Sequence, residues 1–234
     1  MSIPSTTIPV QPHDRYRAAM VEVKQRLRAI DRVLGAKKPR TLSTIFDNEF
    51  MWLQVRKIVE LVAFGGIMAD EARYAALRAE AKDNPNYRRD WKVGHILRRL
   101  AEITPHCLPR PLCELLHLSD GTKRLEVGKE KEMLERFVAI YEHAGEHLHA
   151  PNPFDDEGGE AVRLQLESSR DRLRTEVQYL KDVLWTHVKI GLAFEAGTDV
   201  PRLPASPETA WIVLFGSAND DEVRMALANA LPAD

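Results

Sequence analysis

The residues best suited to chemistry lie in one stretch, from Glu130 to Phe154. It contains Arg136 and two histidines four residues apart, His143 and His147, together with several glutamates. No other part of the chain places so many ionisable groups beside apolar residues at helical spacing. We therefore look for a site in this stretch.

The helical periodicity of this stretch sorts its side chains. Successive helical residues advance about 100°, so each side chain can be placed relative to Arg136. The apolar residues then form one sector that faces a core, and the glutamates face solvent. Arg136, His143 and His147 lie within about 40° of one another at the edge of the apolar sector. We call these three residues the border strip; His149 falls on the opposite edge.

A second stretch supplies candidate supporting residues. The helix expected to start near 43–47 is apolar on most of its circumference, which is typical of a central, buried helix. Within it, Arg56 and Glu60 are four residues apart and can form an ion pair, with Glu49 on a similar face. Together with Tyr141, these residues are expected either to fix the packing or to form the polar floor of a site.

The six residues between Arg136 and His143 give a spacing that resembles the Arg-x(4–6)-His signature of the HEPN superfamily of helical bundles. The resemblance implies a homodimer with paired motifs at its interface and RNA as the partner. Many members are metal-independent endoribonucleases of toxin or phage-defence systems, so no metal or other cofactor is expected. Arg136 would neutralise phosphate charge and His143 would shuttle a proton, with His147 as an auxiliary.

Two other interpretations stay open, so the chain need not be an enzyme. His143, Glu146 and His147 match the His-x-x-Glu-His order of inverted zinc peptidases, and the histidines have the spacing of two helical zinc ligands. Because the sequence identifies no third ligand, a zinc-dependent hydrolase is the less favoured alternative. The structural alternative is a non-catalytic dimerisation or protein-interaction module, in which the border strip caps the core.

The interaction alternative rests on a long amphipathic helix expected from Glu160 to Ala196. An unbroken helix of this length would extend about 55 Å. Leucines and valines form a stripe along it, which is typical of a bundle backbone or a dimer surface.

The other elements predict a mainly α fold: a HEPN-like helical bundle with a small β-hairpin and strand as an appendage. Two strands flanking an Asp-Gly turn predict the hairpin, and Ala210–Gly216 predicts a strand that pairs with it. For 221–231 a helix is slightly favoured over a strand. We divide the chain into a flexible leader (1–12), a bundle domain (13–200) with the hairpin inserted near 113–127, and a strand-containing extension (201–234) packed on the same domain.

Charge is unevenly distributed. Residues 1–110 contain 20 Lys and Arg against 12 Asp and Glu, whereas residues 111–234 contain 13 against 23. This asymmetry is consistent with a basic surface for nucleic acid or another anion, and equally with attraction between the two halves. The basic face of the first helix, which includes Lys24 and Arg28, is expected to be solvated.

Location is predicted from what the sequence lacks. The start of the chain does not resemble a signal peptide, and no apolar run is long enough to span a bilayer. Cys107 and Cys113 do not make a disulfide framework, and with His106 and His117 they match no common zinc spacing. We expect a cytoplasmic protein without membrane contact.

Overall fold

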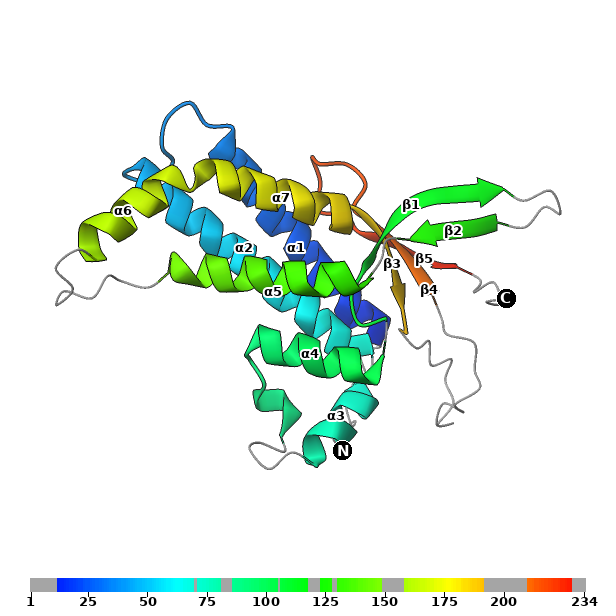
Figure 1. Cartoon of the computed structure of the whole chain (residues 1–234). Coiled ribbons are helices and arrows are strands. Elements are labelled where there is room, and N and C mark those ends of the chain that lie inside the picture. Colours follow the sequence, from blue (N-terminus) through cyan, green and yellow to red (C-terminus); the bar gives the residue numbers. More distant parts are fainter. Residues whose placement is uncertain are drawn as a thin grey trace, which may run out of the picture.

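A computed structural model describes residues 12–69, 71–80, 86–104, 106–117, 123–127, 130–148, 158–191 and 210–228. Helices make up most of it, and a small antiparallel sheet lies at one end (Figure 1). The predicted mainly α fold with a small β appendage is therefore confirmed. Within these residues, none of the helices has both the length and the apolar composition that a bilayer crossing requires.

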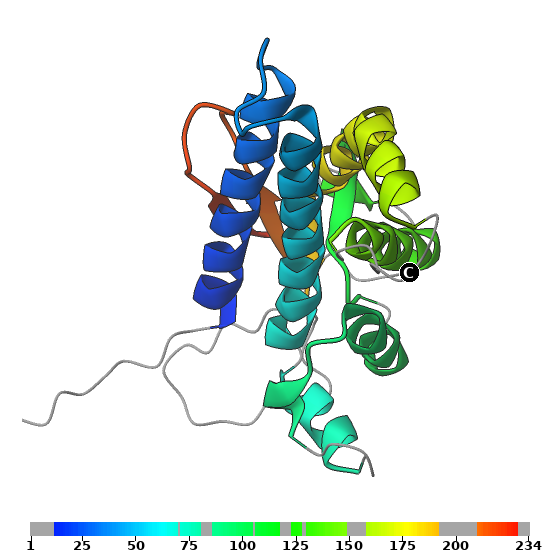
Figure 2. The same ribbon diagram turned by 90° about the vertical axis from the view of Figure 1, so that its left-hand side faces the viewer.

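The helices are built around one central member. They are α1 (Pro12–Leu34), α2 (Thr44–Ala69), α3 (Glu71–Ala79), α4 (Val93–Ile103), α5 (Glu130–Glu146), α6 (Gly158–Ser168) and α7 (Arg170–Leu184), with the 3-10 turn η1 (Tyr87–Arg89) before α4. α1 and α2 run side by side (Figure 2), and α2 also contacts α4, α5, α6 and α7. This surrounding explains why α2 is apolar on nearly every side, as the sequence predicted.

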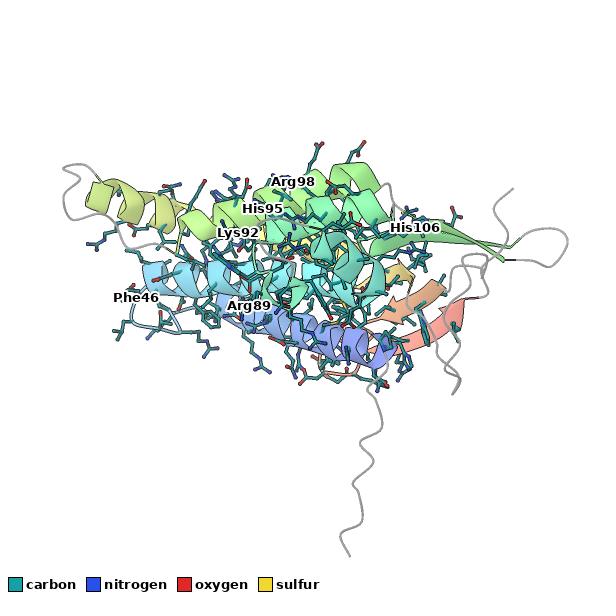
Figure 3. The ribbon with its side chains drawn as sticks, turned by 90° about the horizontal axis from the view of Figure 1, so that it is seen from below. Phe46, Arg89, Lys92, His95, Arg98 and His106 are labelled. Atoms are coloured by element: carbon teal, nitrogen blue, oxygen red, sulfur yellow. The ribbon has the colours of Figure 1, made fainter. Side chains whose placement is uncertain are left out.

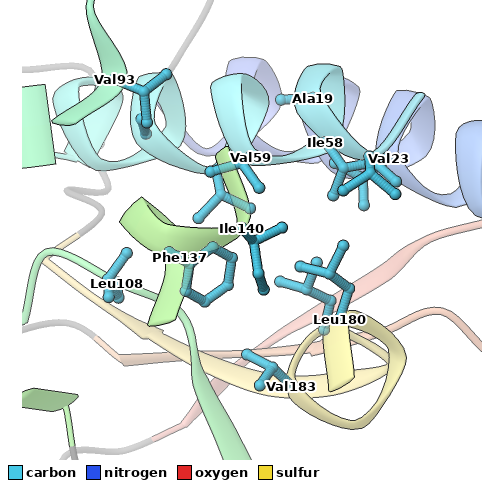
Figure 4. Close-up of a cluster of buried hydrophobic side chains, with 14 of the residues drawn as sticks. Ala19, Val23, Ile58, Val59, Val93, Leu108, Phe137, Ile140, Leu180 and Val183 are labelled. Carbon is cyan, nitrogen blue, oxygen red and sulfur yellow. The ribbon is translucent and has the colours of Figure 1, made fainter. Parts of the chain in front are cut away.

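Part of the core lies where α2, α5 and α7 meet, and buried side chains of α1 and α4 extend it. Side chains from each helix interlock there, including Val59, Phe137, Ile140 and Leu180 (Figure 4). Burying each such side chain stabilises the fold by about 1.5–3 kcal/mol. The core therefore fixes the position of α5, which carries the border strip.

The sheet contains five strands in the order β2-β1-β3-β4-β5, and every neighbouring pair is antiparallel. They are β1 (Arg110–His117), β2 (Lys123–Val127), β3 (Thr186–Ile190), β4 (Ala210–Leu214) and β5 (Arg224–Ala228). The predicted hairpin is β1 and β2, and its turn lies outside the described residues. The predicted strand β4 pairs with β3 and β5 rather than with the hairpin, because β3 lies between them.

The prediction of one long helix from Glu160 to Ala196 is wrong, because the helix is interrupted at Ser169, between α6 and α7. Side chains take the carbonyl oxygens that would continue the helix. Asn48 Nδ2 donates to the carbonyl of Leu166 at 2.9 Å, and Ser169 Oγ donates to the same carbonyl at 2.8 Å. Such local side-chain bonds compete with the helical ladder. An unbroken helix that could carry the expected dimer surface is therefore absent from the described residues.

The end of this segment was also misassigned. Helix α7 ends at Leu184, and residues 186–190 form strand β3. Thr186, Val188 and Ile190 are β-branched at alternate positions, a pattern that favours a strand over a helix. The rest of the expected helix, 192–196, lies outside the described residues.

The C-terminal segment is a strand, and the slight preference for a helix at 221–231 is wrong for residues 224–228. The acidic residues at its head do not begin a helix. Asp220 accepts hydrogen bonds from Lys24 Nζ at 2.7 Å and from the backbone N–H of Glu222 at 3.0 Å. Pairing with β4 then holds the segment extended.

Buried polar side chains join the sheet to the helices. Lys24 is fully buried and donates to the carbonyls of Phe215 and Glu222 as well as to Asp220. Arg28 forms an ion pair with Asp221. The expected solvated face of α1 is thus partly covered by the turn before β5. Here the basic half of the chain attracts the acidic half.

Candidate functional site

Arg136 lies on the side of α5 that faces α7. Its guanidinium donates from Nη2 to Glu176 Oε2 at 2.6 Å and lies 5.4 Å from the centre of the Tyr179 ring. Arg172 approaches the other oxygen of Glu176 at 3.8 Å. Because the Glu176 side chain is only 5% exposed, Arg136 compensates a nearly buried carboxylate.

His143 and His147 lie one turn apart and contact each other. His143 Nε2 is 3.2 Å from His147 Nε2, and His143 Nδ1 is 2.9 Å from Glu146 Oε2. Trp52 of α2 packs against both rings, with centroid distances of 4.9 Å. Trp52 Nε1 in turn donates to Ser169 Oγ at 3.0 Å, at the break between α6 and α7. The histidine pair is therefore fixed between three segments.

The partners assign the protons of this pair. Glu146 accepts from His143 Nδ1–H, and His143 Nε2 then accepts from His147 Nε2–H. Burial, followed by the nearby His143, lowers the pKa of His147 to about 4. A carboxylate-oriented imidazole is the arrangement of a general base. Here, however, His147 occupies the nitrogen that would take the proton, and both histidines are buried.

The border strip therefore divides into two groups. His143 and His147 are brought together, whereas Arg136 contacts Glu176 and Tyr179. The seven-residue separation of Arg136 and His143 corresponds to about 10 Å along a helix axis. In this arrangement the arginine and the histidine serve different neighbours.

The supporting residues form another group, at the contact between α2 and α5. The predicted Arg56–Glu60 ion pair is confirmed, with Nε 3.4 Å from Oε1. Arg56 Nη2 also donates to the Tyr141 hydroxyl at 2.8 Å. A Cβ at Gly145 would lie 2.7 Å from Arg56 Nη1, so the glycine makes room for the guanidinium. Glu49 forms no ion pair with any described residue.

The metal alternatives find little support in the side-chain arrangement. In the parts of the chain that are described, no group of three or more His, Cys, Asp or Glu side chains could hold a metal ion. His143 and His147 thus have no third ligand there. Cys107 is buried, Cys113 is exposed, and His106 Nδ1 bonds to Arg110 Nη2 at 2.8 Å. His149 lies outside the described residues.

A different surface was missed by the sequence analysis. Arg89, Trp91, Lys92, His95 and Arg98 are exposed on η1, α4 and the short link between them, and we call them the α4 basic face. The labelled cations follow one another across the underside of the molecule (Figure 3). The Trp91 side chain is 63% exposed although tryptophan is usually mostly buried.

The basic side chains of this face are grouped around an exposed tryptophan and are not paired with acids. Among the described residues, Arg89, Lys92, His95 and Arg98 form no ion pair and no side-chain hydrogen bond. Lys92 Nζ only lies over the Trp91 ring, 5.7 Å from its centre. Some exposed arginines elsewhere, such as Arg174 beside Asp171, have acidic partners, whereas the exposed Arg32 and Arg163 also form no ion pair among the described residues.

The sequence does contain a signal for this face. The run from Arg88 to Arg99, RRDWKVGHILRR, interleaves basic residues with a tryptophan. The apolar half of α4 faces the core through Val93, Ile96, Leu97 and Leu100. The polar half becomes informative only once its cations are seen to form no ion pair with any described residue.

Comparison of the chain with protein-family models, with curated protein sequences and with solved structures finds no significant match.

Proposed function

We propose that this protein binds single-stranded RNA through the α4 basic face. The observation that carries the proposal is the set of four basic side chains without acidic partners beside an exposed tryptophan. Arginine and lysine pair with backbone phosphates, and a tryptophan ring stacks on a base of any sequence. The proposal keeps the RNA partner that the HEPN resemblance implies and assigns it to a different helix.

The charges of the two candidate regions favour this choice. Arg136 is already engaged by a nearly buried carboxylate, and freeing it would leave Glu176 without its closest cation. A phosphate that binds the α4 basic face displaces only water, because Arg89, Lys92 and Arg98 give up no partner among the described residues. The free energy of each phosphate contact is therefore not offset by a lost ion pair.

The test is RNA binding measured by fluorescence anisotropy with a short unstructured RNA. We expect the triple variant Arg89→Ala/Lys92→Ala/Arg98→Ala to bind at least about tenfold more weakly and to show a salt slope lower by about 2. The matched control is Arg17→Ala/Arg174→Ala/Arg224→Ala, which removes the same charge from exposed, acid-paired positions. Equal losses in both triples, or no binding by the wild type, would contradict the proposal.

A second candidate function, metal-independent RNA cleavage, is favoured by one observation. Glu146, His143 and His147 form a hydrogen-bonded series, which could move a proton if the pair were opened to substrate. Opening is required because Trp52 covers both rings. In this function Arg136 and Arg172, which both approach Glu176, would contact the phosphate.

Cleavage is tested with labelled RNA in the presence of a chelator, for the wild type and for His143→Ala. We expect cleavage by the wild type to resist the chelator and His143→Ala to abolish it. Glu176→Gln, which leaves the histidine series intact, is the control. Cleavage that persists in His143→Ala, or none by the wild type, would remove this second function and leave RNA binding untouched.

A further inference from the structure

A pocket opens in the α4 basic face, between α3, η1 and the first turns of α4. Its volume is about 180 Å³, and it is lined by Arg78, Arg89, Asp90, Trp91, Lys92, His95, Ile96 and Arg99. The lining is rich in basic side chains and contains one acid. A cavity of this size is below the range that holds a whole drug-sized ligand, so it suits a small group such as a phosphate.

The acid of the pocket is neutralised within the protein. Arg78 is 1% exposed, and its Nε lies 2.7 Å from Asp90 Oδ2 while its Nη2 donates to Oδ1 at 3.0 Å. The Tyr74 hydroxyl donates to Oδ2 at 2.8 Å. Burial, with the bond to Asp90, raises the pKa of Tyr74, so this hydroxyl stays protonated and remains a donor. The result is a rigid floor in which one cation and one anion cancel.

The rim then carries the uncompensated charge. Arg89 and Lys92 are permanently cationic near neutral pH, and His95 adds a further nitrogen donor. The first turn of α4 points its N–H groups to the same end, and its N-cap residue, Lys92, makes no side-chain capping bond. The cations of the rim attract an anion, and the helix dipole adds to this attraction.

We propose that this pocket binds the terminal phosphate of a single-stranded RNA while Trp91 stacks on the adjoining base. A terminal phosphate carries about −1.5 to −2 at pH 7, whereas a phosphodiester within the chain carries one negative charge. Two uncompensated cations at a small pocket match the terminal group better. This inference rests on the proposed RNA-binding function and specifies which part of the RNA is recognised.

The test compares RNAs of one sequence that end in a 5′-phosphate, in a 3′-phosphate, or in hydroxyls at both ends. We expect the wild type to bind either the 5′-phosphorylated or the 3′-phosphorylated RNA about tenfold more tightly than the hydroxyl-ended RNA. The reason is that hydrogen bonds to a charged phosphate are stronger than those to a hydroxyl. Uridine monophosphate is the small-molecule arm. If it competes as well as the RNA does at equal concentration, the ligand is a free nucleotide and the proposal is overturned.

Two variants separate this inference from RNA binding in general. Arg89→Ala removes a rim cation and should reduce the preference for the phosphorylated end to near unity. Arg98→Ala, outside the pocket, should weaken both RNAs equally and preserve the preference. Equal wild-type affinity for all three RNAs overturns the terminal-phosphate site while RNA binding stands, and absence of any binding overturns both.

Discussion

The border strip and the α4 basic face contain similar residues in opposite circumstances. Each combines arginine, histidine and a nearby tryptophan. In the border strip the charges are paired within the protein, and Trp52 is fully buried between the histidines and Ser169. On the α4 basic face the cations form no ion pair with any described residue, and Trp91 is 63% exposed. Residue type alone therefore does not identify a site; the partners of each residue do.

The difference follows from the position of the two helices. α5 packs against α2, so its polar edge meets other elements and must satisfy its charges internally. α4 covers the core with one face only, and its opposite face meets solvent. Changes in the border strip should accordingly alter stability, and changes on the α4 basic face should alter binding.

Substitution of the two tryptophans should separate the regions most strongly. Trp52→Ala should lower the free energy of unfolding by about 3–5 kcal/mol, because it empties a packed site between α2, α5 and Ser169. Trp91→Ala should change it by no more than about 0.5 kcal/mol but weaken RNA binding about tenfold. Urea denaturation and anisotropy measure the two effects. A stable Trp52→Ala protein would refute the buried role of the border strip.

Acid should destabilise the protein through its buried histidines. Burial lowers the pKa of His187 to about 4, and its Nδ1 and Nε2 bond to the Leu184 carbonyl and the Tyr16 hydroxyl. The unfolded chain, with a histidine pKa of about 6.5, binds the proton first as the pH falls. Stability should be constant above about pH 6.5 and decrease by roughly 3 kcal/mol for His187 as the pH falls to about 4. His147 should add a loss in the same window.

Denaturation at a series of pH values tests this dependence. His187→Gln retains an acceptor for Tyr16 and does not titrate, so its stability should decline less between pH 6.5 and 4. His95→Gln, on the α4 basic face, is the matched control and should follow the wild-type profile. A wild-type profile that is flat across this window would contradict the neutral, buried state of both histidines.

Two helical glycines offer a smaller contrast. Alanine at Gly145 would place its Cβ 2.7 Å from Arg56 Nη1, whereas alanine at Gly94 would meet Arg98 at 3.7 Å, an ordinary contact. Gly145→Ala should displace Arg56 from Tyr141 and lower stability by about 1 kcal/mol, beyond any gain in helix propensity. Gly94→Ala should be neutral or slightly stabilising. Thermal denaturation of both variants decides the comparison; equal midpoints would show that Arg56 relaxes freely.

The smallest effect is expected at Glu176. Glu176→Gln removes the charge that Arg136 compensates, and Arg136 can turn to solvent because its side chain is already 42% exposed. We expect a stability change of about 1 kcal/mol or less and no change in RNA affinity. A loss of RNA binding in this variant would instead connect the border strip to the α4 basic face.

The sequence predicted those features that depend on local patterns. The apolar circumference of α2, the Arg56–Glu60 pair and the hairpin each follow from spacing within a short segment. The break at Ser169 does not, because it depends on Asn48 and Trp52, more than a hundred residues away. For the same reason the angular position of Arg136 on its own helix could not predict its partner, because Glu176 belongs to another helix.

The C-terminal strand also shows that local sequence patterns are not sufficient. Local propensity at 221–231 slightly favoured a helix, yet β4 offers an edge for pairing and Lys24 binds the preceding turn. Tertiary contacts of this kind override a weak local preference. The α4 basic face is likewise exposed for a tertiary reason: no other described element covers it.

The buried amine of Lys24 has a consequence for biosynthesis. Its acceptors, Phe215, Asp220 and Glu222, lie 191 to 198 positions further along the chain. A ribosome must therefore add 191 residues after Lys24 before this amine can meet the first of its acceptors. Contacts of such long sequence separation slow folding, and the Lys24 amine stays without these acceptors until residues 215–222 are synthesised. A nascent chain that stops before Phe215 should be more sensitive to protease at α1 than one that extends past Glu222.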